Sequence, residues 1–126
     1  MSEQSNIFIK AQPVKLIYGV GYEKCSAEEA THVTINIPGP TGHLTLPVIL
    51  SGPRKGTGKW SWNGSVDKPT LRPSVETDSW RGWKCHSWIT EGNAVFLDDC
   101  THEFRNQTVP LLDANAERKY DQEDEE

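Results

Sequence analysis

The chain of 126 residues contains no apolar run long enough to cross a membrane, and its N-terminal segment lacks the features of a signal peptide. It also lacks a basic excess: the net charge is −5, and no stripe of lysine and arginine is present to neutralise nucleic-acid phosphates. Its three cysteines have no framework spacing, which argues against a secreted disulfide scaffold. We therefore expect a cytoplasmic protein that binds neither membranes nor nucleic acid.

Helical periodicity is equally scarce. Before the C-terminus, only SAEEATH, residues 26–32, predicts one or two helical turns, and ANAERKY, residues 114–120, has weak helical character. Alternating runs bounded by turn residues are common instead, as in HVTINI and HLTLPVIL joined by PGPTG, which predict a hairpin. The expected fold is therefore mainly β, a single small domain of antiparallel hairpins with one or two short helices. We assign this domain to residues 1–119, and interpret residues 120–126 as an acidic disordered tail.

Reactive side chains are concentrated in KCHSWITEGNAVFLDDCTH, residues 84–102. A tight turn at Glu91 and Gly92 predicts a hairpin within this stretch. Strand alternation then places His86 and Asp99 on one face as cross-strand neighbours. A carboxylate in that position orients an imidazole and stabilises its protonated form, although the same pairing also serves as a structural ion pair.

The opposite face of the same hairpin carries cysteines. Cys85 and Cys100 can approach each other there, with His102 nearby, and His43 is a candidate fourth ligand for zinc. The spacing lacks the pattern of a zinc knuckle, and buried cysteines also act as small apolar fillers. A metal site and a packed core remain alternative interpretations of these residues.

Five short blocks, WSWNG, KPTLRPS, CHSW, FLDDCTH and QTVPL, occur in this order along the chain. Together they resemble the signature of a family of small phage and bacterial proteins that includes the BubE-type peptidases, which are found beside bacterial operons that conjugate ubiquitin-like proteins. The resemblance covers about residues 35–113. It implies a serine protease, similar to deubiquitinases, whose partner is a ubiquitin-like protein and whose substrate is the C-terminal tail of that protein.

The resemblance also bears on cofactors. In similar sequences the stretch matching IPGPTGH has two cysteines, which form a four-cysteine zinc site with the counterparts of Cys85 and Cys100. Here those two positions are Ile37 and Pro40. A structural zinc would therefore need the two histidines named above as replacement ligands, and we expect no cofactor to be required.

Two serines are candidates for the nucleophile. Ser87 adjoins His86 on one strand, and successive side chains point to opposite faces, so His86 is poorly placed to activate it. Ser74 begins the preceding strand and can present its hydroxyl to the imidazole. We therefore predict Ser74 as nucleophile, His86 as general base and acid, and Asp99 as orienter, with Asn63 or a nearby backbone amide as the oxyanion donor.

Alternatives remain open at this point. The second choice for the catalytic pair is Ser87 with His102. The second choice for the function is a non-enzymatic, zinc-stabilised binding module of phage or bacterial origin. For the protease, we expect an exposed strand edge near Trp80, Trp83 and Trp88 to bind an extended peptide by strand addition.

Overall fold

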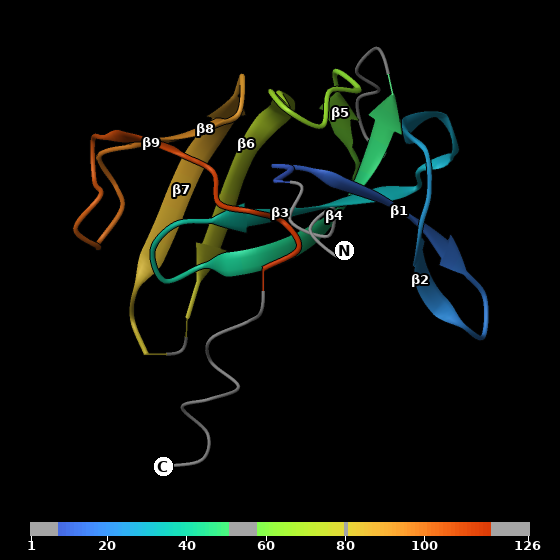
Figure 1. Ribbon diagram of the computed structural model, residues 1–126. Coiled ribbons are helices and arrows are strands. Elements are labelled where there is room, and N and C mark those ends of the chain that lie inside the picture. The colour runs from blue at the N-terminus through green and yellow to red at the C-terminus, as the bar shows by residue number, and fades with distance from the viewer. Residues whose placement is uncertain (1–7, 51–57, 80, 117–126) are drawn as a thin grey trace.

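A computed structural model describes residues 8–50, 58–79 and 81–116. It confirms a mainly β fold, with nine strands in one sheet of order β2-β1-β3-β4-β5-β6-β7-β8-β9 (Figure 1). The strands are β1 (Gln12–Ile17), β2 (Gly21–Lys24), β3 (His32–Ile37), β4 (Gly42–Leu50), β5 (Trp60–Trp62), β6 (Leu71–Asp78), β7 (Lys84–Thr90), β8 (Asn93–Phe96) and β9 (Thr108–Pro110). The predicted helical stretch is a single 3-10 turn, η2 (Ala27–Glu29).

Two further predictions concern the tail and the membrane. The predicted acidic tail, residues 120–126, lies outside the described residues. In the described ranges, no helix is long and apolar enough to cross a membrane.

The β3–β4 hairpin forms as predicted, with the two strands antiparallel and Ile35 opposite Leu44. The pairing of β4 with β5 was not predicted, because it is parallel, from Val48 opposite Trp60 to Leu50 opposite Trp62. Parallel pairing joins strands through longer connections, which leave no local turn signature in the sequence. The sheet is therefore mixed rather than wholly antiparallel.

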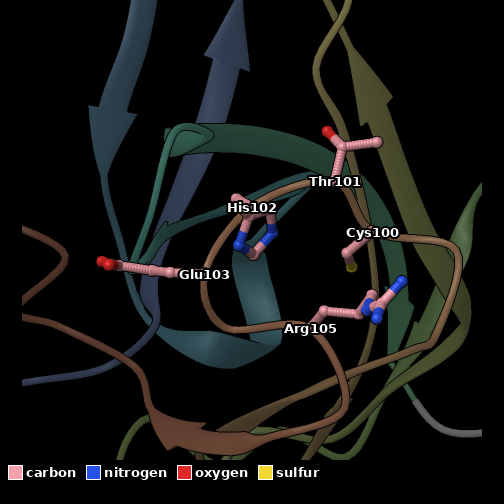
Figure 2. Close-up of a pocket in the computed structure, with 5 residues that line it drawn as sticks. All are labelled: Cys100, Thr101, His102, Glu103 and Arg105. Atoms are coloured by element: carbon pink, nitrogen blue, oxygen red, sulfur yellow. The ribbon is translucent and has the colours of Figure 1, made fainter.

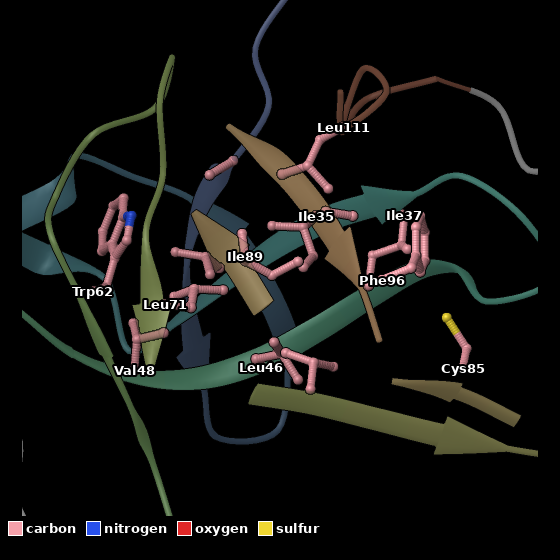
Figure 3. Close-up of a cluster of buried hydrophobic side chains, with 14 of the residues drawn as sticks. Ile35, Ile37, Leu46, Val48, Trp62, Leu71, Cys85, Ile89, Phe96 and Leu111 are labelled. Carbon is pink, nitrogen blue, oxygen red and sulfur yellow. The ribbon is translucent and has the colours of Figure 1, made fainter. Parts of the chain in front are cut away.

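The hydrophobic core of the described residues is built from side chains of several strands (Figure 3). Branched residues of β3 and β4 pack there against apolar residues of β6, β7 and β8. Burying each such side chain contributes about 1.5–3 kcal/mol, so this cluster supplies most of the driving force for folding. The labelled members are Ile35, Ile37, Leu46, Val48, Trp62, Leu71, Cys85, Ile89, Phe96 and Leu111.

The β7–β8 hairpin has the tight turn that the sequence predicted. Thr90 faces Asn93 across the turn, and both central residues have positive φ, 50° at Glu91 and 84° at Gly92. Two positive φ angles are typical of the type I′ turn, whose twist suits antiparallel strands. Burial alternates along β7, so one face enters the core and the other, which includes His86, is accessible.

Candidate active site

Ser74 lies at an irregularity in β6. The pairing of β6 with β7 passes from Leu71 opposite Ile89 to Val75 opposite Ser87, with a register shift between Leu71 and Val75. The Arg72–Pro73 peptide bond within this shift is cis. Proline has no N–H to donate to the ladder, so a bulge is one of the few places in a sheet that accept it. Ser74 is therefore the last residue of the shift, and regular pairing with β7 resumes at Val75.

A continuous chain of hydrogen bonds joins Ser74, His86 and Asp99. Ser74 Oγ lies 2.9 Å from His86 Nε2. On the other side of the ring, His86 Nδ1 lies 3.0 Å from Asp99 Oδ2 and 3.2 Å from Oδ1. With the Nδ1–H donated to the carboxylate, Nε2 is left as the acceptor for the serine hydroxyl. This is the tautomer that a general base for Ser74 requires.

A turn after β8 brings Asp99 to this position. β8 ends at Phe96, and the Cys100 N–H then bonds back to the carbonyl of Leu97 at 3.3 Å. The Cys100 thiol accepts a hydrogen bond from the His86 N–H and donates one to the His86 carbonyl, each at 3.2 Å. Cys100 therefore fastens the turn to the backbone of His86, and its neighbour Asp99 is held beside the imidazole.

Lys84 links the Asp99 carboxylate to a second acid. Its Nζ lies 3.1 Å from Glu76 Oε2 and 3.4 Å from Asp99 Oδ2. The hydrogen bond from His86 is the main cause of a lowered pKa for Asp99, and Lys84 adds to it. The pKa of Lys84 is raised in turn, first by Glu76 and then by Asp99. Asp99 is therefore an anion at neutral pH, as an orienter of His86 must be.

Comparison with known protein families matches residues 23–97 to the bacterial ubiquitination-like system serine proteases, BubE. The chain belongs to the BubE family. Ser74 and His86 lie within the matched range, and Asp99 follows shortly after it. A search of curated proteins and a search of solved structures each found no match. The family is that of a serine protease in a bacterial ubiquitination-like system, which agrees with the resemblance seen in the sequence.

The second choice of catalytic pair is not assembled in this BubE member. Ser87 is fully buried, and its hydroxyl has no hydrogen-bond partner among the described residues. The Nδ1 of His102 instead accepts a hydrogen bond from the Phe104 N–H at 3.2 Å. A substrate cannot reach a hydroxyl that is sealed in the core, so Ser87 does not have the exposure that a nucleophile needs.

The Asn63 side chain is engaged within its own turn. Its amide nitrogen donates to the Lys68 carbonyl at 3.1 Å, and its oxygen accepts from the N–H groups of Ser65 and Thr70. Asn and Asp side chains commonly close turns in this way. The sequence suggested Asn63, or a backbone amide of the WNGS stretch, as the oxyanion donor, but these bonds direct the Asn63 side-chain donor to Lys68.

The predicted zinc ligands do not assemble into a metal site. Within residues 8–50, 58–79 and 81–116, no three or more histidine, cysteine, aspartate or glutamate side chains form a group that could hold a metal ion. Burial raises the pKa of the Cys85 thiol, and both Cys85 and Cys100 are buried free cysteines. The two cysteines therefore fit the alternative interpretation, as core residues. The four residues affected are Cys85, Cys100, His102 and His43.

The hollow next to the site is separate from the hydrogen-bonded chain. It opens over the loop that follows Asp99, as Figure 2 shows. Ser74, His86 and Asp99 are not among its lining residues, so it does not present a ligand to the hydroxyl of Ser74. The lining residues are Cys100, Thr101, His102, Glu103 and Arg105.

Sequence reasoning missed the residues that support the site. Lys84 lies on the same face of β7 as His86, as the spacing of two between them indicates, and Glu76 is opposite His86 on β6. The Trp60 indole donates a hydrogen bond to the Ser74 carbonyl at 3.3 Å, and only the tertiary fold brings these residues together. Period-two spacing was thus a usable signal for Lys84, whereas nothing local indicated Trp60.

Proposed function

We propose that this member of the BubE family hydrolyses peptide bonds with Ser74 as nucleophile, His86 as general base and Asp99 as orienter. The observation that carries the proposal is the 2.9 Å hydrogen bond between Ser74 Oγ and His86 Nε2, with Asp99 on the opposite ring nitrogen. A hydroxyl is a weak nucleophile until a base accepts its proton, and this arrangement supplies the base.

The reaction follows from the positions of these groups. Ser74 Oγ forms a bond to the carbonyl carbon of the substrate while its proton passes to His86 Nε2. Asp99 stabilises the imidazolium, which then gives the proton to the departing amine as the C–N bond breaks. Water, deprotonated by His86, attacks the acyl-enzyme and restores the Ser74 hydroxyl. The products are a carboxylic acid and an amine, and His86 ends neutral.

The substrate in this proposal is a ubiquitin-like protein, cleaved at its C-terminal tail during processing or removal from a target. The support is the family, whose proteases belong to a bacterial ubiquitination-like system. The alternative, a zinc-stabilised binding module, is not carried forward, because no group of described residues forms a metal site that would favour it.

A fluorophosphonate probe tests the nucleophile without knowledge of the substrate. Wild-type protein is expected to gain one adduct, which peptide mapping locates on Ser74. Ser74→Ala should lose the adduct, and His86→Ala should lower the labelling rate by about 10²–10⁴-fold, the usual contribution of a general base. Ser87→Ala, in which the rival hydroxyl is removed, is the matched control and should label like the wild type. An adduct on Ser87, or full labelling of Ser74→Ala, would remove the proposal.

The substrate is tested separately. A ubiquitin-like protein encoded next to the protease gene is incubated with wild-type and Ser74→Ala protein, and its C-terminus is read by mass spectrometry. Shortening of the tail by the wild type alone supports the proposal. An intact tail, with a protease that still labels on Ser74, would refute the substrate and leave the catalytic residues in place.

A further inference from the structure

One side of β6 is unpaired next to Ser74. On its inner side, β6 pairs with β7 through Val75–Asp78. On its outer side, β5 pairs with β6 only at Leu71 and Arg72. Figure 1 shows the same arrangement, with β5 beside one end of β6 only. The outer side of β6 is thus left without a paired strand from Ser74 onwards in the part of the chain that the structure describes.

The backbone groups at this edge point away from β7. Glu76 is opposite His86 in the register, yet the His86 N–H and carbonyl are bonded to Cys100 Sγ and the Leu97 N–H. In an antiparallel ladder, hydrogen-bonded pairs alternate with non-hydrogen-bonded pairs, so Glu76 and His86 form a non-hydrogen-bonded pair. The N–H and carbonyl of Glu76 therefore face the outer side of β6.

Asp78 repeats the pattern two residues further on. It is opposite Lys84, whose N–H donates to Thr101 Oγ1 at 2.8 Å and whose carbonyl accepts from the Thr101 N–H at 3.0 Å. The backbone groups of Asp78 therefore also face outward, and no strand among the described residues pairs with Glu76 or Asp78 on that side. Both residues are exposed.

An exposed row of alternating donors and acceptors is a template for an added strand. The Ser74 carbonyl points to the same side, because it accepts its hydrogen bond from Trp60. We propose that the polypeptide substrate binds as an additional strand along the outer edge of β6, from Ser74 to Asp78, and that this pairing brings the scissile carbonyl to Ser74 Oγ. The inference rests on the proposed function and names how that site binds its substrate.

The order of the groups across the sheet agrees with the chemistry. An added strand would lie about 4.8 Å from β6. Ser74 would then have the imidazole of His86 on its inner side and the peptide on its outer side. The proton of Ser74 then passes to His86 on the β7 side, while Ser74 Oγ attacks the peptide on the outer side. The imidazole and the peptide therefore do not compete for the same space. Recognition through the backbone selects an extended segment, such as an unstructured tail, over a folded surface.

Peptidyl diphenyl phosphonates are suitable probes, because Ser74 Oγ displaces a phenoxide and the adduct is counted by mass. A series with one to four alanine residues is reacted with wild-type protein. Strand addition predicts a second-order rate constant about tenfold or more higher for four residues than for one, since each added backbone hydrogen bond contributes. N-methylation of single amides should then lower this gain at every second position only, the period of a strand.

The labelling results distinguish a failure of strand addition from a failure of the proposed protease function. Labelling of Ser74 at a rate independent of chain length, or lowered equally by every N-methyl group, would overturn strand addition and leave the nucleophile intact. Failure of every probe to label Ser74 would overturn the proposed function, and the inference with it. A labelling rate that rises with chain length, and that N-methylation lowers at every second position, supports both strand addition and the proposed function.

Two substitutions of Glu76 test the outer edge of β6 by changing the protein instead of the probe. Glu76→Pro and Glu76→Ala both lack the carboxylate, but only the proline also lacks the outward N–H. For each variant, the rate of Ser74 labelling by the four-residue phosphonate is divided by the rate with the one-residue phosphonate. Any effect of the substitution on the reactivity of the triad cancels in this ratio. This ratio should be severalfold lower in Glu76→Pro than in Glu76→Ala, and equal ratios would contradict the edge as the binding site. Should Glu76→Pro fail to fold, the N-methyl series on the wild type decides.

Discussion

Asp99→Asn is the substitution that separates a catalytic triad from a structural hydrogen bond. The carboxylate accepts from His86 Nδ1 at 3.0 and 3.2 Å, so it fixes the tautomer in which Nε2 accepts from Ser74. Asparagine has nearly the same shape but carries no charge, and its NH₂ group can turn toward Nδ1 and favour the opposite tautomer. In a triad whose aspartate is buried, this change lowers kcat by about 10⁴-fold.

The expected magnitude here is smaller, because the Asp99 side chain is 40 % exposed. Water screens the attraction between the carboxylate and the imidazolium, and Lys84, 3.4 Å away, offsets part of the negative charge. We expect the fluorophosphonate labelling rate of Ser74 to fall by about 10²–10³-fold, below the value for a buried triad.

The control for this prediction is the neighbouring acid. Asp98→Asn changes the net charge by the same amount one residue away, and Asp98 is exposed and makes no hydrogen bond to the described part of the site. It should label at the wild-type rate. If Asp99→Asn labels within about threefold of Asp98→Asn, the carboxylate does not control the imidazole and the triad is not catalytic.

Two further predictions concern the supports of the site. Cys100→Ala leaves the partly buried His86 N–H without its acceptor, so we expect about 1–3 kcal/mol of lost stability in urea titrations and slower labelling. Cys100→Ser keeps a donor and an acceptor and should lose less, and equal stabilities of the two variants would contradict the bridging role. Burial lowers the pKa of His102 below 6.5, so the unfolded chain binds more protons and stability should decline as pH falls below about 6.5. His102→Asn keeps an acceptor for the Phe104 N–H and should show a smaller decline between pH 7.5 and 5.5, and an unchanged slope would refute this assignment.

The local parts of the fold could be predicted from the sequence. Glu91 and Gly92 specify a tight turn, and strand alternation then sorts the side chains of β7 correctly onto the two faces. This sorting suffices to place Cys85 and Ser87 in the core and His86 outside it. The turn residues and the alternation of side chains along β7 are therefore enough to predict this hairpin.

Features without a local signature in the sequence could not be predicted. The register shift in β6 and the parallel pairing of β4 with β5 are of this kind, because the shift lies within a strand and parallel strands are not joined by a tight turn. The pairing predicted around Glu91 and Gly92 stops at Phe96, where a turn replaces the expected strand. Asp99 reaches His86 through this turn, and the prediction that they meet held although the assumed geometry did not.

The proposed metal site shows the limit of reasoning from residue types. Cys85, Cys100, His102 and His43 are all ligands that zinc accepts, and the hairpin brings the two cysteines to one buried face. Ligand geometry, however, requires the donor atoms to converge on one point, and burial alone does not provide that. The thiol of Cys100 is instead turned toward the backbone of His86.

The register shift connects the nucleophile to the proposed substrate edge. If the pairing of Leu71 with Ile89 continued regularly, Ser74 would lie directly opposite His86; the shift gives that place to Glu76. Ser74 then meets His86 Nε2 from a diagonal position, which leaves Glu76 free to bind Lys84 beside Asp99. The central strand β7 thus carries the base between its two partners, with Asp99 on the β8 side and Ser74 on the β6 side. Because His86 occupies the inner side of Ser74, an extended substrate in the plane of the sheet can approach the hydroxyl only from the outer side of β6.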